Sequence, residues 1–474
     1  MYGQLFVFIF AIFLLFLWTV RKPKNLPPGE WGLPIVGYIP FMSWKLSKTL
    51  MNLQKKHGDI FTIKVGSKTW VVLTDFDVIK SAFQKVLFSG RPIFYQYIVL
   101  KKINHKGIIL SNGKIWETSR RFALRTLRDF GFGKSSFLDE IIYNEAHSLI
   151  ENLKEKVNLP TEIQWEVNVA IFNIIWKLVA NKRYEISDKE VQKFSKDLSD
   201  NIVDCEGKMA LLTLFPKVVP FVPNYIKNRW MLVDTVEKRR DEMLRMLENV
   251  IEEHKRNLDP KNPKDFIDKY LIELEAQKDN PDYQYWGDDD LLLHVYDFFL
   301  AGTETTSSTI RWFFLYMAKN QEIQKKVQKQ IDENISKGEQ VSLHDKDRLP
   351  LLEALNFEFP NAIPHEVMED TVLEGYNIPK GTWIIPDVES CHRNPKYWKL
   401  PNEFSLENFL DEDGKVIRNK DGYLPFSLGK RVCVGESLAK MELFVFFGAI
   451  LQNFEISEPV GENASLEPNP NPRY

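Results

Sequence analysis

Cys433 lies in a ten-residue run, FSLGKRVCVG from Phe426 to Gly435, that combines a thiol with a basic residue and two glycines. The residues that follow have helical spacing and are good helix formers. At the start of a helix, free backbone N–H groups and the helix dipole stabilise a thiolate, and Arg431 adds a cation nearby. Gly429 and Gly435 would let the backbone approach a flat partner closely. These neighbours favour a chemically active thiolate over an inert buried cysteine.

A second candidate for chemistry is the segment LAGTETT, residues 300–306. Threonine hydroxyls can bond the carbonyls of the preceding turn and bend a helix, and Gly302 leaves space for a small ligand. Glu304 next to Thr305 is the minimal pair for a proton relay, because an acid stands beside a hydroxyl. The alternative is a solvated, threonine-rich helix turn.

A third candidate pairs an indole with a guanidinium. Trp116 and Arg120 are one helical turn apart and therefore share a face, which suits charge-assisted binding of a carboxylate. The alternative is an amphipathic surface helix with a buried tryptophan.

The run from Phe426 to Gly435 fits Phe-x-x-Gly-x-Arg-x-Cys-x-Gly at every fixed position, and it resembles the haem-binding loop of the cytochrome P450 superfamily. The resemblance implies that Cys433 is the axial thiolate ligand of the iron of haem b. It also implies that the cofactor contacts include both ends of this run, together with the following set: Trp116, Arg120, His365 and Arg431 at the haem propionates, and Ala301 and Gly302 beside the haem.

The same resemblance assigns Glu304 and Thr305 to proton delivery, since residues 301–306 look like the superfamily's Ala/Gly-Gly-x-Asp/Glu-Thr-Thr/Ser signature. It implies a monooxygenase that inserts one atom of O2 into a lipophilic small molecule, such as a xenobiotic, a fatty acid or a steroid. The 33 phenylalanines and the apolar approach at residues 297–301 predict an apolar cavity.

Electrons would come from NADPH–cytochrome P450 reductase, with cytochrome b5 as a further donor. The sequence has no Gly-x-Gly-x-x-Gly or phosphate-binding loop, so nicotinamide and flavin should bind elsewhere. We expect a basic docking patch near the cysteine loop, formed by Arg120, Arg121, Lys430, Arg431 and Lys440. Lys440 could equally be an ordinary solvated position on a helix.

The pattern breaks at the superfamily's Glu-x-x-Arg helix. Glu358 is the best match for its acid, but Asn361 stands three positions later and Pro360 would end the helix. Asn408 stands in the following meander where Arg or His is expected. The alternative function is therefore a non-catalytic or truncated haem-binding relative anchored to the membrane. A haem-thiolate isomerase is weakened because the acid and alcohol of the proton relay are retained.

The elements that must position these residues are mostly helical. Helical spacing predicts helices over residues 144–156, 235–256 and 289–319, and short alternating runs predict strands at residues 60–73 and 371–386. The expected body, residues 38–474, is thus mainly α (α+β), with the cytochrome P450 fold: a large helical domain and a small side sheet.

Residues 5–20 are uncharged and almost wholly apolar, which predicts a membrane anchor over residues 1–20. Arg21, Lys22 and Lys24 follow directly, so the body should lie on the cytosolic side. A cleaved signal peptide would carry its charge before the apolar run. Residues 21–37 form a basic, Pro/Gly-rich hinge. The expected location is the endoplasmic reticulum membrane, where the glycosylation patterns at Asn334 and Asn463 would stay unused.

Composition narrows the remaining classes. The chain has 474 residues, of which 62 are Lys or Arg and 65 are Asp or Glu. Its net charge of −3 provides no overall positive electrostatic field that would attract nucleic acid. Three cysteines exclude a disulfide scaffold and any zinc or iron-sulfur site that needs four cysteines from one chain. Apolar residues make up 44% of the chain, enough to build a large core.

Overall fold

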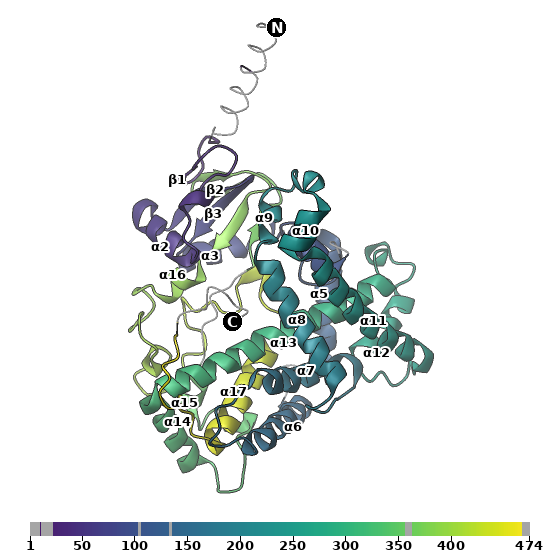
Figure 1. Cartoon of the computed structure of the whole chain (residues 1–474), viewed down its shortest axis with the longest axis vertical. Helices are drawn as coiled ribbons and strands as arrows, with labels where there is room; N and C mark the ends of the chain where they lie inside the picture. The colour runs from purple at the N-terminus through teal and green to yellow at the C-terminus, as the bar shows by residue number, and fades with distance from the viewer. Residues whose placement is uncertain (1–9, 11–21, 103–105, 132–134, 356–362, 467–474) are drawn as a thin grey trace.

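The computed structural model of the chain describes residues 10, 22–102, 106–131, 135–355 and 363–466. Strands gather at one end of the molecule, and helices make up the rest (Figure 1). This mainly helical architecture with small sheets confirms the predicted fold class.

The larger sheet has the strand order β1-β2-β3-β7-β4. β2 (Ile60–Val65) and β3 (Lys68–Leu73) form an antiparallel hairpin, which confirms the prediction from residues 60–73. β7 (Trp383–Pro386) pairs parallel to β3, and β4 (His365–Glu366) lies antiparallel at the edge beyond β7. The chain just before β4 and the chain around β3 are thereby brought together, although they are far apart in the sequence.

The second predicted strand segment splits between two sheets. β5 (Thr371–Leu373) and β6 (Tyr376–Ile378) form their own two-stranded sheet around a turn at Glu374 and Gly375, both of which have positive φ. A further turn follows before β7 joins the larger sheet. The sequence pattern located the apolar runs but did not show that they belong to two sheets.

The longest helix, α13 (Asp288–Lys319), has 32 residues and crosses the molecule. Three aspartates occupy its first turn and a lysine its last, as the helix dipole favours. α7 (Gln164–Ala180) and α17 (Glu436–Asn453) pack against it and are largely apolar. Burial of these three helices against one another forms the centre of the main hydrophobic core.

The predicted helices are also confirmed at residues 144–156, in α6 (Ser135–Lys154), and at residues 235–256, in α11 (Val233–Asn257). The remaining α-helices are α2 (Leu46–His57), α3 (Phe76–Phe83), α4 (Tyr95–Lys101), α5 (Gly113–Asp129), α8 (Lys189–Glu206), α9 (Ala210–Leu214), α10 (Asn224–Met231), α12 (Phe266–Ala276), α14 (Gln321–Asn334), α15 (Pro350–Glu353) and α16 (Val388–His392). The 3-10 helices are η1 (Ile39–Phe41), η2 (Val86–Phe88), η3 (Val219–Phe221), η4 (Pro281–Tyr283), η5 (Leu343–Asp345), η6 (Leu406–Asn408) and η7 (Gly429–Arg431).

The predicted hinge contains no helix over residues 22–37, in agreement with its prolines and glycines. Its β1 (Gly29–Glu30) pairs parallel with β2, and Gly37 forms a bridge to Val65. Apart from residue 10, the predicted anchor lies outside the described residues. None of the helices in the described ranges is both long and apolar enough to cross a bilayer.

Candidate active site

The loop before α17 holds Cys433 in a compact turn. The Cys433 N–H donates to the Phe426 carbonyl at 2.9 Å, closing the run that the sequence singled out. Gly429 has φ +69°, and a Cβ there would lie 2.0 Å from the carbonyl oxygen of Phe83. Only glycine therefore fits where the loop meets the end of α3. Gly435 precedes α17, where an added Cβ would lie 3.9 Å from the Cys433 sulfur.

The Cys433 side chain is exposed to solvent, but the protein atoms around its sulfur desolvate the thiol and thereby raise its pKa. The side chain is thus enclosed by protein but remains reachable. Hydrogen bonds from the backbone of Gly435 and Glu436, and the charge of Arg120, lower the pKa by less than burial raises it. The expected helix-end stabilisation is present, but the nearby cation that acts is Arg120. A metal that coordinated this sulfur would deprotonate the thiol.

Two of the predicted anion-binding side chains lie stacked. The guanidinium carbon of Arg431 lies 4.0 Å from the ring centroid of Trp116. Arg431 donates to the carbonyls of Ser89 and Ser111, and Arg120 donates to the carbonyl of Val432 at 2.6 Å. The structure therefore brings α5 and the cysteine loop together through these three side chains.

His365, on β4, is buried and stacks on Phe83 with ring centroids 3.8 Å apart. Its Nδ1 donates to the Phe88 carbonyl at 2.7 Å, because a carbonyl can only accept. Burial, with the nearby charge of Arg91 and Arg431, lowers the His365 pKa well below its usual value.

Arg91 is a member of this group that the sequence interpretation missed. It is buried and donates to the carbonyls of Ile363 and Pro364, directly before His365. Burial lowers its pKa to about 10. Burial and the charges of Arg91 and Arg120 lower the pKa of Arg431 to about 8. A single arginine before a proline, in a loop, gives no periodic or spacing signal from which its role could be predicted.

These side chains present unused donors. Three buried donor nitrogens of this group have no hydrogen-bond partner among the described residues: Trp116 Nε1, Arg91 Nε and Arg431 Nη1. His365 Nε2 is also unpaired, and it is the acceptor nitrogen of the neutral ring because Nδ1 carries the proton. No carboxylate in the described ranges bonds to any of these side chains or to Arg120. Unpaired buried donors and crowded cations are costly, so the set fits a ligand that carries carboxylates. Haem, with two propionates, meets that requirement.

The middle of α13 supplies the second half of the site. Ala301 and Thr305 are exposed although the positions around them in the helix are largely buried, and they share a face because they are four residues apart. The Thr305 hydroxyl donates to the Ala301 carbonyl at 2.7 Å, as predicted for this segment. Gly302 faces another element: a Cβ there would lie 2.7 Å from Ile175 Cδ1 of α7. This glycine therefore permits the close packing of α7 on α13.

Glu304 is held by three donors. Arg311 Nη2 bonds Oε1 at 2.7 Å, Ser308 bonds the same oxygen at 3.0 Å, and Ser199 of α8 bonds Oε2. Although both residues are described, Glu304 shares no hydrogen bond with Thr305. The structure thus brings the predicted acid and alcohol into one helix turn without joining them.

A buried acid that the sequence interpretation did not single out lies behind α13. Glu442 on α17 is 1% exposed and accepts from the Thr306 hydroxyl at 3.1 Å through Oε2, while Oε1 has no partner among the described residues. Burial raises its pKa to about 8. The sequence did contain a signal for this buried acid, because Glu442 lies inside the otherwise apolar run of residues 441–447.

The broken Glu-x-x-Arg pattern falls mostly on residues 356–362, outside the described residues, which include Glu358, Pro360 and Asn361. The preceding helix, α15, ends at Glu353, whose carboxylate pairs with Arg418. Asn408 is buried and bonds the backbone N–H and carbonyl of Leu400, at 2.9 and 3.0 Å. Asn408 therefore connects two parts of the meander, the irregular segment that contains residues 400–408, through hydrogen bonds to its backbone.

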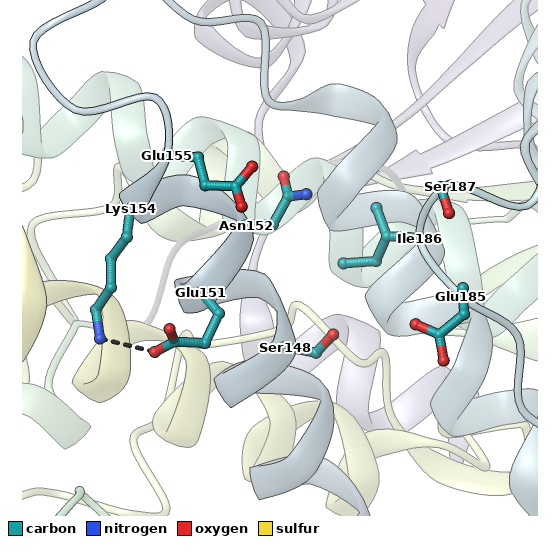
Figure 2. A pocket seen from close by; sticks show the side chains of 8 residues that line it. All are labelled: Ser148, Glu151, Asn152, Lys154, Glu155, Glu185, Ile186 and Ser187. Carbon is teal, nitrogen blue, oxygen red and sulfur yellow. Dashed lines mark hydrogen bonds and ion pairs between the residues drawn. The ribbon is translucent and has the colours of Figure 1, made fainter.

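A separate surface pocket of about 470 Å³ lies between α6 and the segment after α7 (Figure 2). Its lining is mainly polar: Ser148, Glu151, Asn152, Lys154, Glu155, Glu185, Ile186 and Ser187. Glu151 and Lys154 pair across one turn of α6 at 2.7 Å. Three carboxylates make this pocket a poor place for a lipophilic molecule, and none of the candidate site residues lines it.

Comparison with known proteins agrees with this geometry. Residues 27–471 match the family model described as Cytochrome P450. The chain is 42% identical to cytochrome P450 2L1 of Panulirus argus over 95% of this chain and 92% of that protein. It is 36% identical to cytochrome P450 2J3 of Rattus norvegicus, over 94% and 89% of the two chains. It is also 36% identical to cytochrome P450 2B4 of Oryctolagus cuniculus, over 96% and 93%.

Proposed function

Because the chain belongs to the cytochrome P450 family, whose members are haem-thiolate monooxygenases, we propose that Cys433 supplies its iron ligand and that α13 supplies its proton relay. The match over residues 27–471 favours the monooxygenase over a non-catalytic relative. The assignment of residues rests on three buried donors that have no partner among the described residues and that lie on the elements around an accessible thiol.

In this proposal the propionates are bound by Trp116, Arg120, His365 and Arg431, and by Arg91, which we add. The exposed side chains of Ala301 and Thr305 lie on the oxygen side, while Gly302 keeps α7 close to the helix. Phe426 and Gly435 complete the cysteine loop. Haem, when bound, provides the iron that activates O2 for insertion of one oxygen atom into the substrate.

The chain's own contribution to that reaction is proton supply. The hydroxyl proton of Thr305 is directed at the Ala301 carbonyl, so the lone pairs of its oxygen remain free to accept. When Thr305 Oγ1 accepts a proton, it can release its own toward the oxygen side. Glu304 is the preceding residue, about 100° round the helix from Thr305, and its carboxylate bonds Ser199 of α8. Because Glu304 and Thr305 share no hydrogen bond, a proton passes between them through water or after rotation of the Glu304 side chain.

The reaction needs a redox partner, O2 and a substrate, and we propose NADPH–cytochrome P450 reductase, with cytochrome b5 as a further donor. Of the predicted docking cations, Arg121 and Lys430 are exposed, and Lys440 pairs with Glu436. Arg431 is buried and cannot contact a partner protein. We propose a lipophilic substrate, consistent with the predicted apolar cavity.

We also propose a single N-terminal anchor in the endoplasmic reticulum membrane with the body on the cytosolic side. β1, α9 and α10 lie at the strand end of the molecule (Figure 1), and exposed apolar side chains on or near these elements support the proposal. The turn between β2 and β3 joins the two segments that carry them, because the Gly66 N–H bonds the Val36 carbonyl at 3.1 Å and the Ser67 N–H bonds the Leu214 carbonyl at 2.9 Å. The exposed residues are Ile35, Phe41, Trp44, Val218, Phe221, Tyr225 and Trp230. A patch of this kind suits a lipid surface.

The test is the carbon monoxide difference spectrum of the reduced full-length chain in membranes, measured beside Cys433→Ser. A red-shifted, thiolate-type Soret band that is lost in the Ser variant would support the proposal. A blue-shifted band in both proteins, or no band in either, would contradict ligation through Cys433.

A further inference from the structure

Glu304 is more firmly held than a lone acid on a helix needs to be. Its carboxylate bonds Arg311 and Ser308 along α13, and Arg311 Nη2 also donates to Ser308 Oγ at 2.6 Å. The second oxygen is bonded by Ser199, which is buried on a different helix. Both oxygens are thus occupied, and one of the three contacts connects α13 to α8.

The contact has a polar surround. Asn168 of α7 lies 3.5 Å from Ser199 Oγ, and its Oδ1 is buried without a partner among the described residues. The Nε of Arg311 is likewise buried and unpaired in the described part of the chain. Charge-assisted hydrogen bonds are about twice as strong as neutral ones, so this cluster fixes the direction of the carboxylate.

We propose that Ser199 and Arg311 are positioning residues for the proton relay. They fix the orientation of the Glu304 carboxylate, and Ser199 makes that orientation depend on the position of α8. The inference rests on the proposed role of Glu304 and Thr305. It adds two residues that act through Glu304 and touch neither substrate nor cofactor.

α8 also provides a matched control. Ser195 lies one turn before Ser199 on the same helix, is buried, and has a hydroxyl without a partner among the described residues. Ser195→Ala therefore removes the same atom from the same helix without touching Glu304. Arg311→Lys keeps the charge and Arg311→Gln removes it.

The first readout is the amount of hydrogen peroxide released per NADPH consumed by the full-length protein with reductase and no added substrate. Electrons from NADPH reduce O2 to hydrogen peroxide with two electrons and two protons, or to two waters with four of each. Misdirected proton delivery favours the first outcome, so Ser199→Ala and Arg311→Gln should raise the ratio by about twofold or more, from loss of a charge-assisted bond. Ser195→Ala should leave it unchanged, and Arg311→Lys should restore most of the loss. Equal ratios for Ser199→Ala and Ser195→Ala would overturn the proposal.

The second readout does not depend on turnover. In a double-variant cycle, the unfolding midpoints of Ser199→Ala and Glu304→Gln should shift less together than the sum of the single shifts, because both remove one interaction. Ser195→Ala with Glu304→Gln should be additive. Additivity for Ser199 would overturn the proposal. Absence of the thiolate-type Soret band in the unaltered chain would instead refute the proposed function, and it is measured separately.

Discussion

Replacing Glu442 with glutamine should flatten the dependence of stability on pH. The Glu442 carboxyl is 1% exposed, has a single hydrogen bond, and has its pKa raised from 4.5 to about 8 by burial. The folded protein therefore holds a proton at neutral pH that the unfolded chain has released. Glutamine has almost the same shape and never ionises.

The sign follows from linkage. Because the folded pKa lies above the unfolded one, the stability that this group contributes is complete below pH 4.5 and is lost as the pH rises toward 8. Each pH unit in that window costs about 1.4 kcal/mol, so about 2 kcal/mol should be lost between pH 5.5 and pH 7. Glu442→Gln removes that loss, whatever constant cost its buried amide adds.

The assay is urea unfolding of the haem-loaded protein at several pH values, followed by circular dichroism. The difference in unfolding free energy between the unaltered chain and Glu442→Gln should move by about 2 kcal/mol across this range, in favour of the variant at higher pH. Glu455→Gln, at an exposed position just after α17, is the control. Parallel pH curves for the unaltered chain and Glu442→Gln would refute the reasoning.

Three other substitutions test separate parts of the structure. Trp116→Phe keeps the ring under Arg431 but removes the unpaired N–H, so haem dissociation, followed by transfer to apomyoglobin, should accelerate by about tenfold. Gly302→Ala forces a Cβ against Ile175 and should cost about 1 to 3 kcal/mol in urea unfolding, part of which Ile175→Val should restore. In a chain without residues 1–21, Phe221→Asp should weaken binding to phospholipid vesicles in a flotation assay, since this residue is 83% exposed.

The sequence located the parts of the site that lie in contiguous runs. The loop around Cys433 and the segment from Ala301 to Thr305 carry their signals within ten residues, because a turn and a helix are local structures. The long helices were predicted for the same reason, through spacing alone. The hairpin at residues 60–73 followed from alternation around a short turn.

Residues that act through distant contacts left no such signal. Arg91 joins the cation group because the preceding residue, Gly90, forms an antiparallel bridge with Glu366 of β4, which places residues 363–365 beside it. Ser199 reaches Glu304 only because α8 packs near α13. These relations depend on tertiary packing, which spacing in one sequence does not encode. The prediction that Gly302 lies beside the haem stays a prediction, and the sequence did not indicate that its missing side chain also makes room for α7.

The sequence has no recognisable Glu-x-x-Arg pair to brace the meander. Two other sets of contacts could stabilise it, and their expected free energies can be compared. Arg418 pairs with Glu353 and Asp347, but the arginine side chain is 59% exposed, and such surface pairs contribute at most about 1 kcal/mol. Asn408 is buried and satisfies both backbone groups of Leu400. Removing it would leave these groups unpaired, at about 1 to 3 kcal/mol each.

Asn408→Ala should therefore destabilise the protein by several times as much as Arg418→Ala in urea unfolding, and it should also lower the haem content, because the meander leads directly into the cysteine loop. Asn408→Asp keeps the acceptor for the Leu400 N–H, but it loses the donor and turns a buried carboxylate toward the Leu400 carbonyl, so it too should cost more than Arg418→Ala. Equal effects of Asn408→Ala and Arg418→Ala would instead mean that the surface ion pair carries the meander. In that case the short helix ending at Glu353 would have taken over the bracing role of the missing arginine.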